Sequence, residues 1–60
     1  MEPTAAQLRS LYRHSYQLTE MFRQPIHMVR LDERTGNLFI LAGVEELIEL
    51  EIDLQGELLT

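Results

Sequence analysis

The run Leu38–Gly43 is the sequence feature that most limits how this chain can fold. It has no polar side chain at any position, whereas a strand with one face in water alternates between apolar and polar residues. A turn signal stands before the run at Thr35–Asn37, and Gly43 ends it. We therefore predict a central β-strand over residues 37–42 that is covered on both faces.

Residues 26–32 predict a second strand, which pairs with the first through the loop Glu33–Gly36. Gly36 supplies the positive φ that a tight turn requires. Pairing Asp32 with Asn37 sets the register, which places Leu31 opposite Leu38, Arg30 opposite Phe39, Val29 opposite Ile40 and Met28 opposite Leu41. One face of the hairpin then carries Val29, Leu31, Leu38 and Ile40, and the other carries Met28, Arg30, Phe39 and Leu41.

Residues 47–54 predict a third strand, because apolar and acidic residues alternate from Ile48 to Leu54. A helix over residues 44–51 is the alternative, since Val44, Leu47, Ile48 and Glu51 also have helical spacing. The strand is favoured because the apolar residues at 50, 52 and 54 would interrupt the polar face of that helix. Gln55–Gly56 then predicts a tight turn, with a brief return of the chain over residues 57–59.

The N-terminal part of the chain has a helical pattern over residues 5–23. Thr4 and Gln7 fit a capping box at its start, and Pro25 disfavours helical geometry at Gln24 and so ends it. The apolar stripe of this helix consists of Leu8, Leu11, Leu18 and Phe22, with Ser15 in the gap. We expect the stripe to cover Val29, Leu31, Leu38, Ile40 and the apolar side of the third strand.

These elements predict one small α+β domain over residues 1–60, in which an N-terminal helix packs on a three-stranded antiparallel β-meander. A chain of this length buries only about 60% of its unfolded surface, so its stability is marginal. It also has no cysteine for a disulfide or a thiolate metal site. Small domains without such cross-links often gain stability from a partner chain. A second copy of the chain is the simplest cover for the second face of the sheet, with Met28, Arg30, Phe39 and Leu41 as the contacting residues.

The charge of the chain is unevenly distributed. Residues 1–30 hold four arginines and two glutamates, a net charge of +2, whereas residues 31–60 hold one arginine and eight acids, a net charge of −7. On the predicted helix, tyrosine and arginine gather on about a quarter of the circumference, together with Glu20. This helix flank consists of Arg9, Tyr12, Arg13, Tyr16 and Arg23.

Three interpretations of the helix flank remain open. In the first it is a solvated surface on which Glu20 pairs with Arg23. In the second it contacts another protein, and in the third the bases of single-stranded RNA stack on it. Tyrosine and arginine are enriched at protein-binding hot spots and also stack on nucleobases. A net acidic chain is a poor non-specific binder of nucleic acid, so RNA is possible but less favoured.

No residue pattern predicts a catalytic, metal or cofactor site, and we expect the protein not to be an enzyme. Ser10 and His14 are neighbours on the helix, but a catalytic nucleophile also needs an orienting acid and an oxyanion hole, and one short helix cannot supply a pocket. His27 stands alone near a strand start. The acids Glu49, Glu51 and Asp53 do not converge along a strand as a metal would require, so they form a solvated face or a docking face for a basic partner.

The ends and the apolar segments of the chain predict a cytoplasmic protein with no membrane partner. Met1–Thr4 lacks the basic cluster and apolar core of a signal peptide. The longest apolar run, residues 38–44, is far shorter than the ~20 residues of a membrane-spanning helix.

The segments Pro25–Ile26 and Val29–Gly43 resemble a family of short uncharacterised cyanobacterial proteins. In that family a helix with a Leu-Tyr pair, which is Leu11-Tyr12 here, precedes an Asp-Glu-Arg-Thr-Gly hairpin and an Ile-Leu-Ala-Gly strand. The resemblance covers most of the chain after Ala5. It implies a cytoplasmic protein with no assigned activity, and it transfers no catalytic or binding residue.

The sequence thus predicts a small non-catalytic protein-interaction module that forms a homodimer, or binds another small protein, through the second face of its sheet. The alternative is a regulator that binds RNA or a partner toxin through the helix flank.

Overall fold

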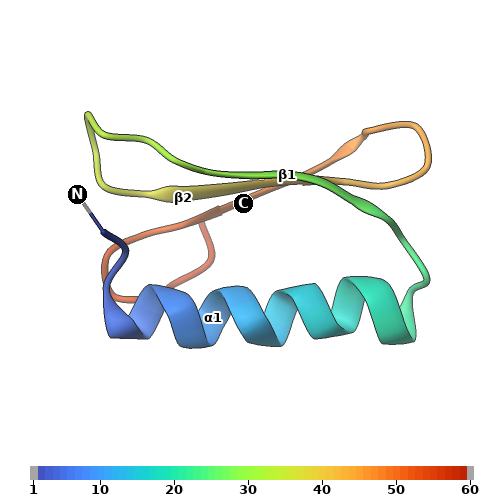
Figure 1. Ribbon diagram of the computed structural model, residues 1–60, viewed down its shortest axis with the longest axis horizontal. Helices are drawn as coiled ribbons and strands as arrows, with labels where there is room; N and C mark the ends of the chain where they lie inside the picture. Colours follow the sequence, from blue (N-terminus) through green and yellow to red (C-terminus); the bar gives the residue numbers. More distant parts are fainter. Residues whose placement is uncertain (1, 60) are drawn as a thin grey trace.

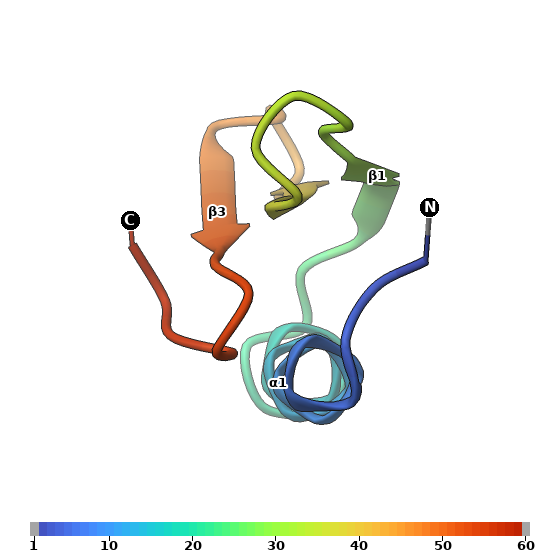
Figure 2. The same cartoon turned by 90° about the vertical axis from the view of Figure 1, so that its left-hand side faces the viewer.

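The computed structural model describes residues 2–59 and consists of one helical layer packed beneath one sheet (Figures 1 and 2). The three strands are antiparallel in the order β1-β2-β3. This arrangement confirms the predicted α+β fold, and the alternative helix over residues 44–51 is wrong. The elements are α1 (Ala5–Tyr16), the π-helical turn η1 (Gln17–Met21), β1 (Ile26–Leu31), β2 (Leu38–Ala42) and β3 (Ile48–Ile52).

The register of the β1–β2 hairpin is the predicted one at all four positions. The Asp32 N–H donates to the Asn37 carbonyl at 2.8 Å, and Gly36 has a φ of +83°, so the turn has the expected form. A bulge lies between Ile26 and Met28, at the start of β1. It follows Pro25, where the chain enters the sheet from the helix. On the other side of β2, Phe39 pairs with Glu51 and Leu41 pairs with Glu49.

The helix begins at the predicted capping box. The Thr4 hydroxyl accepts the Gln7 N–H at 3.0 Å, and the Gln7 side-chain oxygen accepts the Thr4 N–H at 2.9 Å. The helix ends at Met21, two residues earlier than predicted. Its last turn widens to π geometry, and Arg23 then adopts a φ of +56°, which turns the chain toward Pro25.

The hydrophobic core lies between α1, η1 and the sheet. Its buried residues are Leu18, Leu38, Ile40, Ala42 and Ile52, and the partly buried residues around them are Leu11, Ile26, Leu31, Ile48 and Leu50. The predicted helical stripe is wrong at both ends, because Leu8 is 51% exposed and Phe22 is 63% exposed. Gln7 and Ser10 are buried instead, so the helix is rotated about its axis from the predicted orientation.

The buried amide of Gln7 explains this rotation. Its nitrogen donates to the Gly36 carbonyl at 2.7 Å and to the Ile52 carbonyl at 3.3 Å. Gln7 therefore ties the start of α1 to the β1–β2 turn and to the end of β3. A polar side chain is stable in this interior position because its hydrogen bonds are satisfied.

Two further predictions about the sheet need correction. Val29 is exposed rather than covered by the helix, because α1 packs most closely against β3 and β1 lies at the opposite edge of the sheet. The third strand is shorter than predicted, and both Leu47 and Leu54 lie outside it and are exposed.

The C-terminal segment returns along β3 and packs on the start of the helix (Figure 2). As predicted, the chain turns at Gly56 and Leu58 forms a bridge with Ile52. Gly56 has a φ of +84°, and a Cβ there would lie 2.7 Å from the Ala6 carbonyl oxygen. Glycine is therefore required both by the backbone conformation and by the close approach to α1.

Candidate interaction surfaces

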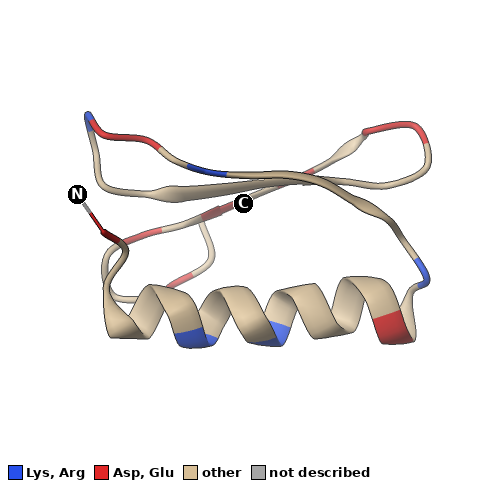
Figure 3. Ribbon diagram, in the orientation of Figure 1, with Lys and Arg blue, Asp and Glu red and all other residues tan. Residues whose placement is uncertain are grey.

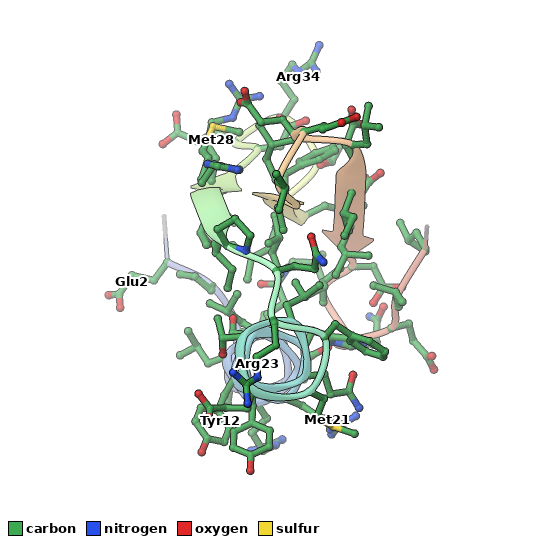
Figure 4. All side chains as sticks on the ribbon, turned by 90° about the vertical axis from the view of Figure 1, so that its right-hand side faces the viewer. Glu2, Tyr12, Met21, Arg23, Met28 and Arg34 are labelled. Atoms are coloured by element: carbon green, nitrogen blue, oxygen red, sulfur yellow. The ribbon has the colours of Figure 1, made fainter. Side chains whose placement is uncertain are left out.

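The first candidate surface is the face of the sheet turned away from the helix, which we call the far face. It consists of Met28, Arg30, Phe39, Leu41, Glu49 and Glu51. Arg30, Phe39 and Glu51 form one row across the strands, and Met28, Leu41 and Glu49 form the next. No helix or strand of the described chain covers this face (Figures 1 and 2), and Figure 4 shows Met28 on the opposite side of the sheet from the helix.

A depression of about 230 Å³ lies on the far face. The predicted residues Met28, Arg30, Phe39 and Leu41 all line it, together with Ile40 and Glu49. The structure therefore brings together the four side chains that the sequence assigns to the second face of the sheet. Phe39 and Leu41 on β2 are half-buried at its centre. They lie between Arg30 on β1 and the two glutamates on β3.

The charges of the far face are separated onto its two edges. Arg30 lies on β1, whereas Glu49 and Glu51 lie on β3. Within residues 2–59 Arg30 forms no ion pair. Glu51 accepts a hydrogen bond from the Asn37 amide at 2.7 Å, which holds its carboxylate on this face.

The second arginine near this surface, Arg34, is already paired with Asp32 in the hairpin turn. The Arg34 Nε lies 3.3 Å from the Asp32 carboxylate, and the Arg34 backbone N–H donates to the same oxygen at 2.9 Å. These hydrogen bonds hold the pKa of Asp32 below its ordinary value and raise the pKa of Arg34. Arg30 is thus the arginine of this region that has no ion pair within residues 2–59.

The second candidate surface is the side of the helix turned away from the sheet, which we call the outer helix face. It consists of Leu8, Arg9, Tyr12, Arg13, Tyr16 and Met21, which with Gln17 line an open depression of about 740 Å³. The two basic bands on α1 in Figure 3 lie on this side, and Figure 4 shows Tyr12 and Met21 below the helix, away from the sheet.

Four of the five residues predicted for the helix flank therefore lie together, and Arg23 lies just beyond the end of η1. The Tyr12 and Tyr16 rings are 6.3 Å apart at an angle of 39°. The Glu20–Arg23 ion pair, which belongs to the solvated-surface interpretation, does not form within the described residues. The sequence interpretation missed Leu8 and Met21; the spacing of Leu8, Tyr12 and Tyr16 at intervals of four residues is the signal that indicates a second apolar stripe.

The Ser10–His14 neighbours do meet, but their hydrogen bonding is structural. The His14 Nδ1 lies 3.3 Å from the Ser10 hydroxyl and 2.8 Å from the Ser10 carbonyl oxygen. A carbonyl only accepts, so Nδ1 carries the proton in that bond and is not free to take one from the hydroxyl. The His27 ring nitrogen Nε2 donates similarly to the Gly43 carbonyl at 2.7 Å.

The acid Asp53 follows directly after β3 and stabilises the next turn. Asp53 accepts hydrogen bonds from the backbone N–H groups of Gln55 and Glu57, each at 2.9 Å.

Over residues 2–59, the His, Asp and Glu side chains form no cluster of three or more that is suited to a metal ion. None of the helices described has the length and apolar composition needed to cross a membrane.

Comparison with known proteins identifies a family but no characterised relative. No curated protein and no solved structure matches the chain. A family described as a domain of unknown function, DUF6888, matches residues 2–59. The match spans the helix, the sheet and both candidate surfaces, and the chain belongs to the DUF6888 family.

Proposed function

We propose that this protein is a small non-catalytic protein-interaction module that forms a homodimer through the far face of its sheet. The observation that carries the proposal is that the helix covers one side of the sheet, while the other side has an apolar centre with opposite charges on its two edges. A sheet of this kind is stable in water when a second layer packs about 10 Å from it.

The charge pattern of the far face matches a second copy of itself. In a two-fold dimer every contact occurs twice. If the axis runs parallel to β2, the β1 edge of one copy faces the β3 edge of the other. Arg30 then lies opposite Glu51 of the second copy, because both residues stand in the same row as Phe39. Two such ion pairs flank a centre in which Phe39 meets Phe39 and Leu41 meets Leu41.

The other face-to-face axis, across the strands, is disfavoured by charge. It would place Glu51 over Glu49 of the second copy and Arg30 over Met28. Like charges that face each other across an interface are costly. The axis parallel to β2 is therefore the arrangement that we propose.

Sedimentation equilibrium tests the dimer. The far face has a small contact area, so the dimer is expected to be weak. The association should therefore be followed at protein concentrations from about 10 µM to about 1 mM. We expect the wild type to shift from monomer to dimer across this range and Leu41→Asp to remain monomeric, because a carboxylate would be buried at the centre of the contact. Tyr12→Asp, on the outer helix face, is the matched control and should dimerise like the wild type. A wild type that stays monomeric at every concentration contradicts the proposal.

The outer helix face supports a second candidate function, that of a regulator that binds RNA or a partner toxin. The observation in its favour is the open depression between Leu8 and Met21, in which Tyr12, Tyr16 and two arginines meet. Both proposals include the cytoplasmic location and the cyanobacterial origin that the sequence suggests.

A further inference from the structure

The outer helix face has more apolar surface than the water-facing side of a helix usually carries. Tyr12 is 71% exposed and Met21 is 64% exposed, and Leu8 and Tyr16 are about half exposed. The solvent side of such a helix is typically polar. Contiguous exposed apolar residues of this kind mark interaction sites.

The charge of this face is of one sign, in contrast to the far face of the sheet. Arg9 and Arg13 line the depression itself, and Arg23 follows it at the end of η1. Glu20 is the only acid on the helix. Two copies that met through this face would bring their arginines together, which opposes self-association.

From this charge and this apolar surface we infer that the outer helix face binds an acidic, amphipathic segment of a different protein. The segment presents an aliphatic or aromatic side chain to the apolar part of the depression, which Leu8, Tyr12 and Tyr16 line. It places carboxylates against Arg9 and Arg13, which can each hold a carboxylate with two N–H groups. Docking of an amphipathic segment in an apolar groove is a recurrent mode of protein recognition.

The same observations favour a protein over RNA. The chain has five arginines, no lysine and a net charge of −5, whereas RNA binding draws most of its affinity from neutralised phosphates. Eight acids lie in residues 31–60, and they would repel a long polyanion that extended past the helix. A short acidic segment is confined to the arginine surface and avoids this repulsion.

The test is selection of displayed random peptides of about 12 residues against the folded wild-type protein. We expect the selected peptides to be rich in Asp and Glu around one or two large apolar residues. A selected peptide, labelled for fluorescence anisotropy, should bind the double variant Arg9→Gln/Arg13→Gln and the variant Tyr12→Ala each at least about tenfold more weakly. Arg34→Gln, whose arginine lies on the distant hairpin turn, is the control and should leave the affinity unchanged.

Three results would overturn the inference. The first is selection that yields no peptides, or peptides without acidic residues. The second is a selected peptide whose affinity is the same for the wild type and for both variants of the outer helix face. The third is a single-stranded oligouridine probe that binds more tightly than the selected peptide and loses affinity in Arg9→Gln/Arg13→Gln. Circular dichroism should show that each variant keeps the fold, since all the altered side chains are exposed.

Discussion

The far face of the sheet and the outer helix face are both apolar surfaces edged by arginine, but their charge patterns differ. On the far face, Arg30 and Glu51 stand at opposite ends of one row across the strands. On the outer helix face, Arg9 and Arg13 lie beside exposed tyrosines, and the acid Glu20 is outside the depression. The first surface is complementary to itself under a two-fold axis, and the second is not.

The two proposals therefore assign a different kind of recognition to each surface. A surface with opposite charges on its two edges is complementary to a second copy related by a two-fold axis. A surface with charges of one sign repels its own copy and favours a partner of the opposite charge. The two surfaces lie on opposite sides of the shared core (Figure 4). One surface can therefore be occupied while the other stays open.

The largest effect is expected from Gln7→Ala, which weakens the packing between α1 and the sheet and so affects both surfaces together. The substitution removes the donor to the Gly36 and Ile52 carbonyls and half of the capping box at Thr4. Loss of a partner for buried polar groups should lower the free energy of unfolding by about 1–3 kcal/mol. Thermal unfolding checks this, at a protein concentration low enough to keep the chain monomeric.

The control for Gln7→Ala is Gln17→Ala, which changes the same residue type at the start of η1, the helical turn that follows α1. Gln17 makes no side-chain hydrogen bond within the described residues. An equal loss of stability in the two variants would show that the buried amide of Gln7 is not what fixes the helix against the sheet.

A smaller effect, of opposite sign, is expected from Arg23→Gly. Arg23 has a φ of +56°, where glycine carries less strain than any other residue, so the substitution should raise the free energy of unfolding by up to about 1 kcal/mol. Glu46→Gly is the matched control, because Glu46 has a φ of +57° in the β2–β3 turn, away from the helix. Denaturant titration should show similar stabilisation in both.

The same pair of variants distinguishes the outer helix face from the far face. Removing the Arg23 side chain should weaken the binding of an acidic peptide to the outer helix face, and Glu46→Gly should not. Neither variant should change the dimer, since neither residue lies on the far face. A peptide affinity that is the same in both variants would remove Arg23 from the binding surface.

The smallest effect is expected from Asp32→Asn and depends on pH. Arg34 holds the pKa of Asp32 below its ordinary value of 3.8, so the carboxylate stabilises the fold fully above that value, and its contribution is lost as the pH falls through the lowered pKa. The Arg34 side chain is 88% exposed, so the contribution is small and is screened by salt. Thermal unfolding from neutral to strongly acidic pH should show that wild type and Asp32→Asn differ near neutrality and converge in acid.

Substitution of each arginine near the far face distinguishes the role of Arg30 from that of Arg34. Because Arg34 is paired within the chain, Arg34→Gln should leave dimerisation unchanged, whereas Arg30→Gln should weaken it. A larger effect of Arg34→Gln would mean that the hairpin turn, and not the face of the sheet, makes the contact.

The sequence was sufficient for the sheet because its signals are local and strong. The alternation in residues 48–52 and the glycine of the Glu33–Gly36 turn fix which strands pair, and the period of two fixes which residues share a face. The far-face residues Met28, Arg30, Phe39 and Leu41 follow directly from that register.

The orientation of the helix was harder to predict, because a polar residue decides it. A pattern of apolar residues assigns Leu8 to the core and Gln7 to solvent, and the structure shows the reverse. The two backbone carbonyls that bind the Gln7 amide come from residues 29 and 45 positions further along the chain. Such long-range hydrogen bonds, and the π-helical last turn, leave no periodic signal in the sequence.

The most direct test of the self-complementary far face is to mix two variants, Arg30→Glu and Glu51→Arg. Each alone places like charges opposite each other twice and should remain monomeric at concentrations where the wild type dimerises. In an equimolar mixture, each new carboxylate at position 30 faces a new guanidinium at position 51. Sedimentation equilibrium should therefore show a heterodimer with nearly wild-type affinity. A mixture that stays monomeric, or a Glu51→Arg variant that dimerises more tightly by itself, would contradict the account.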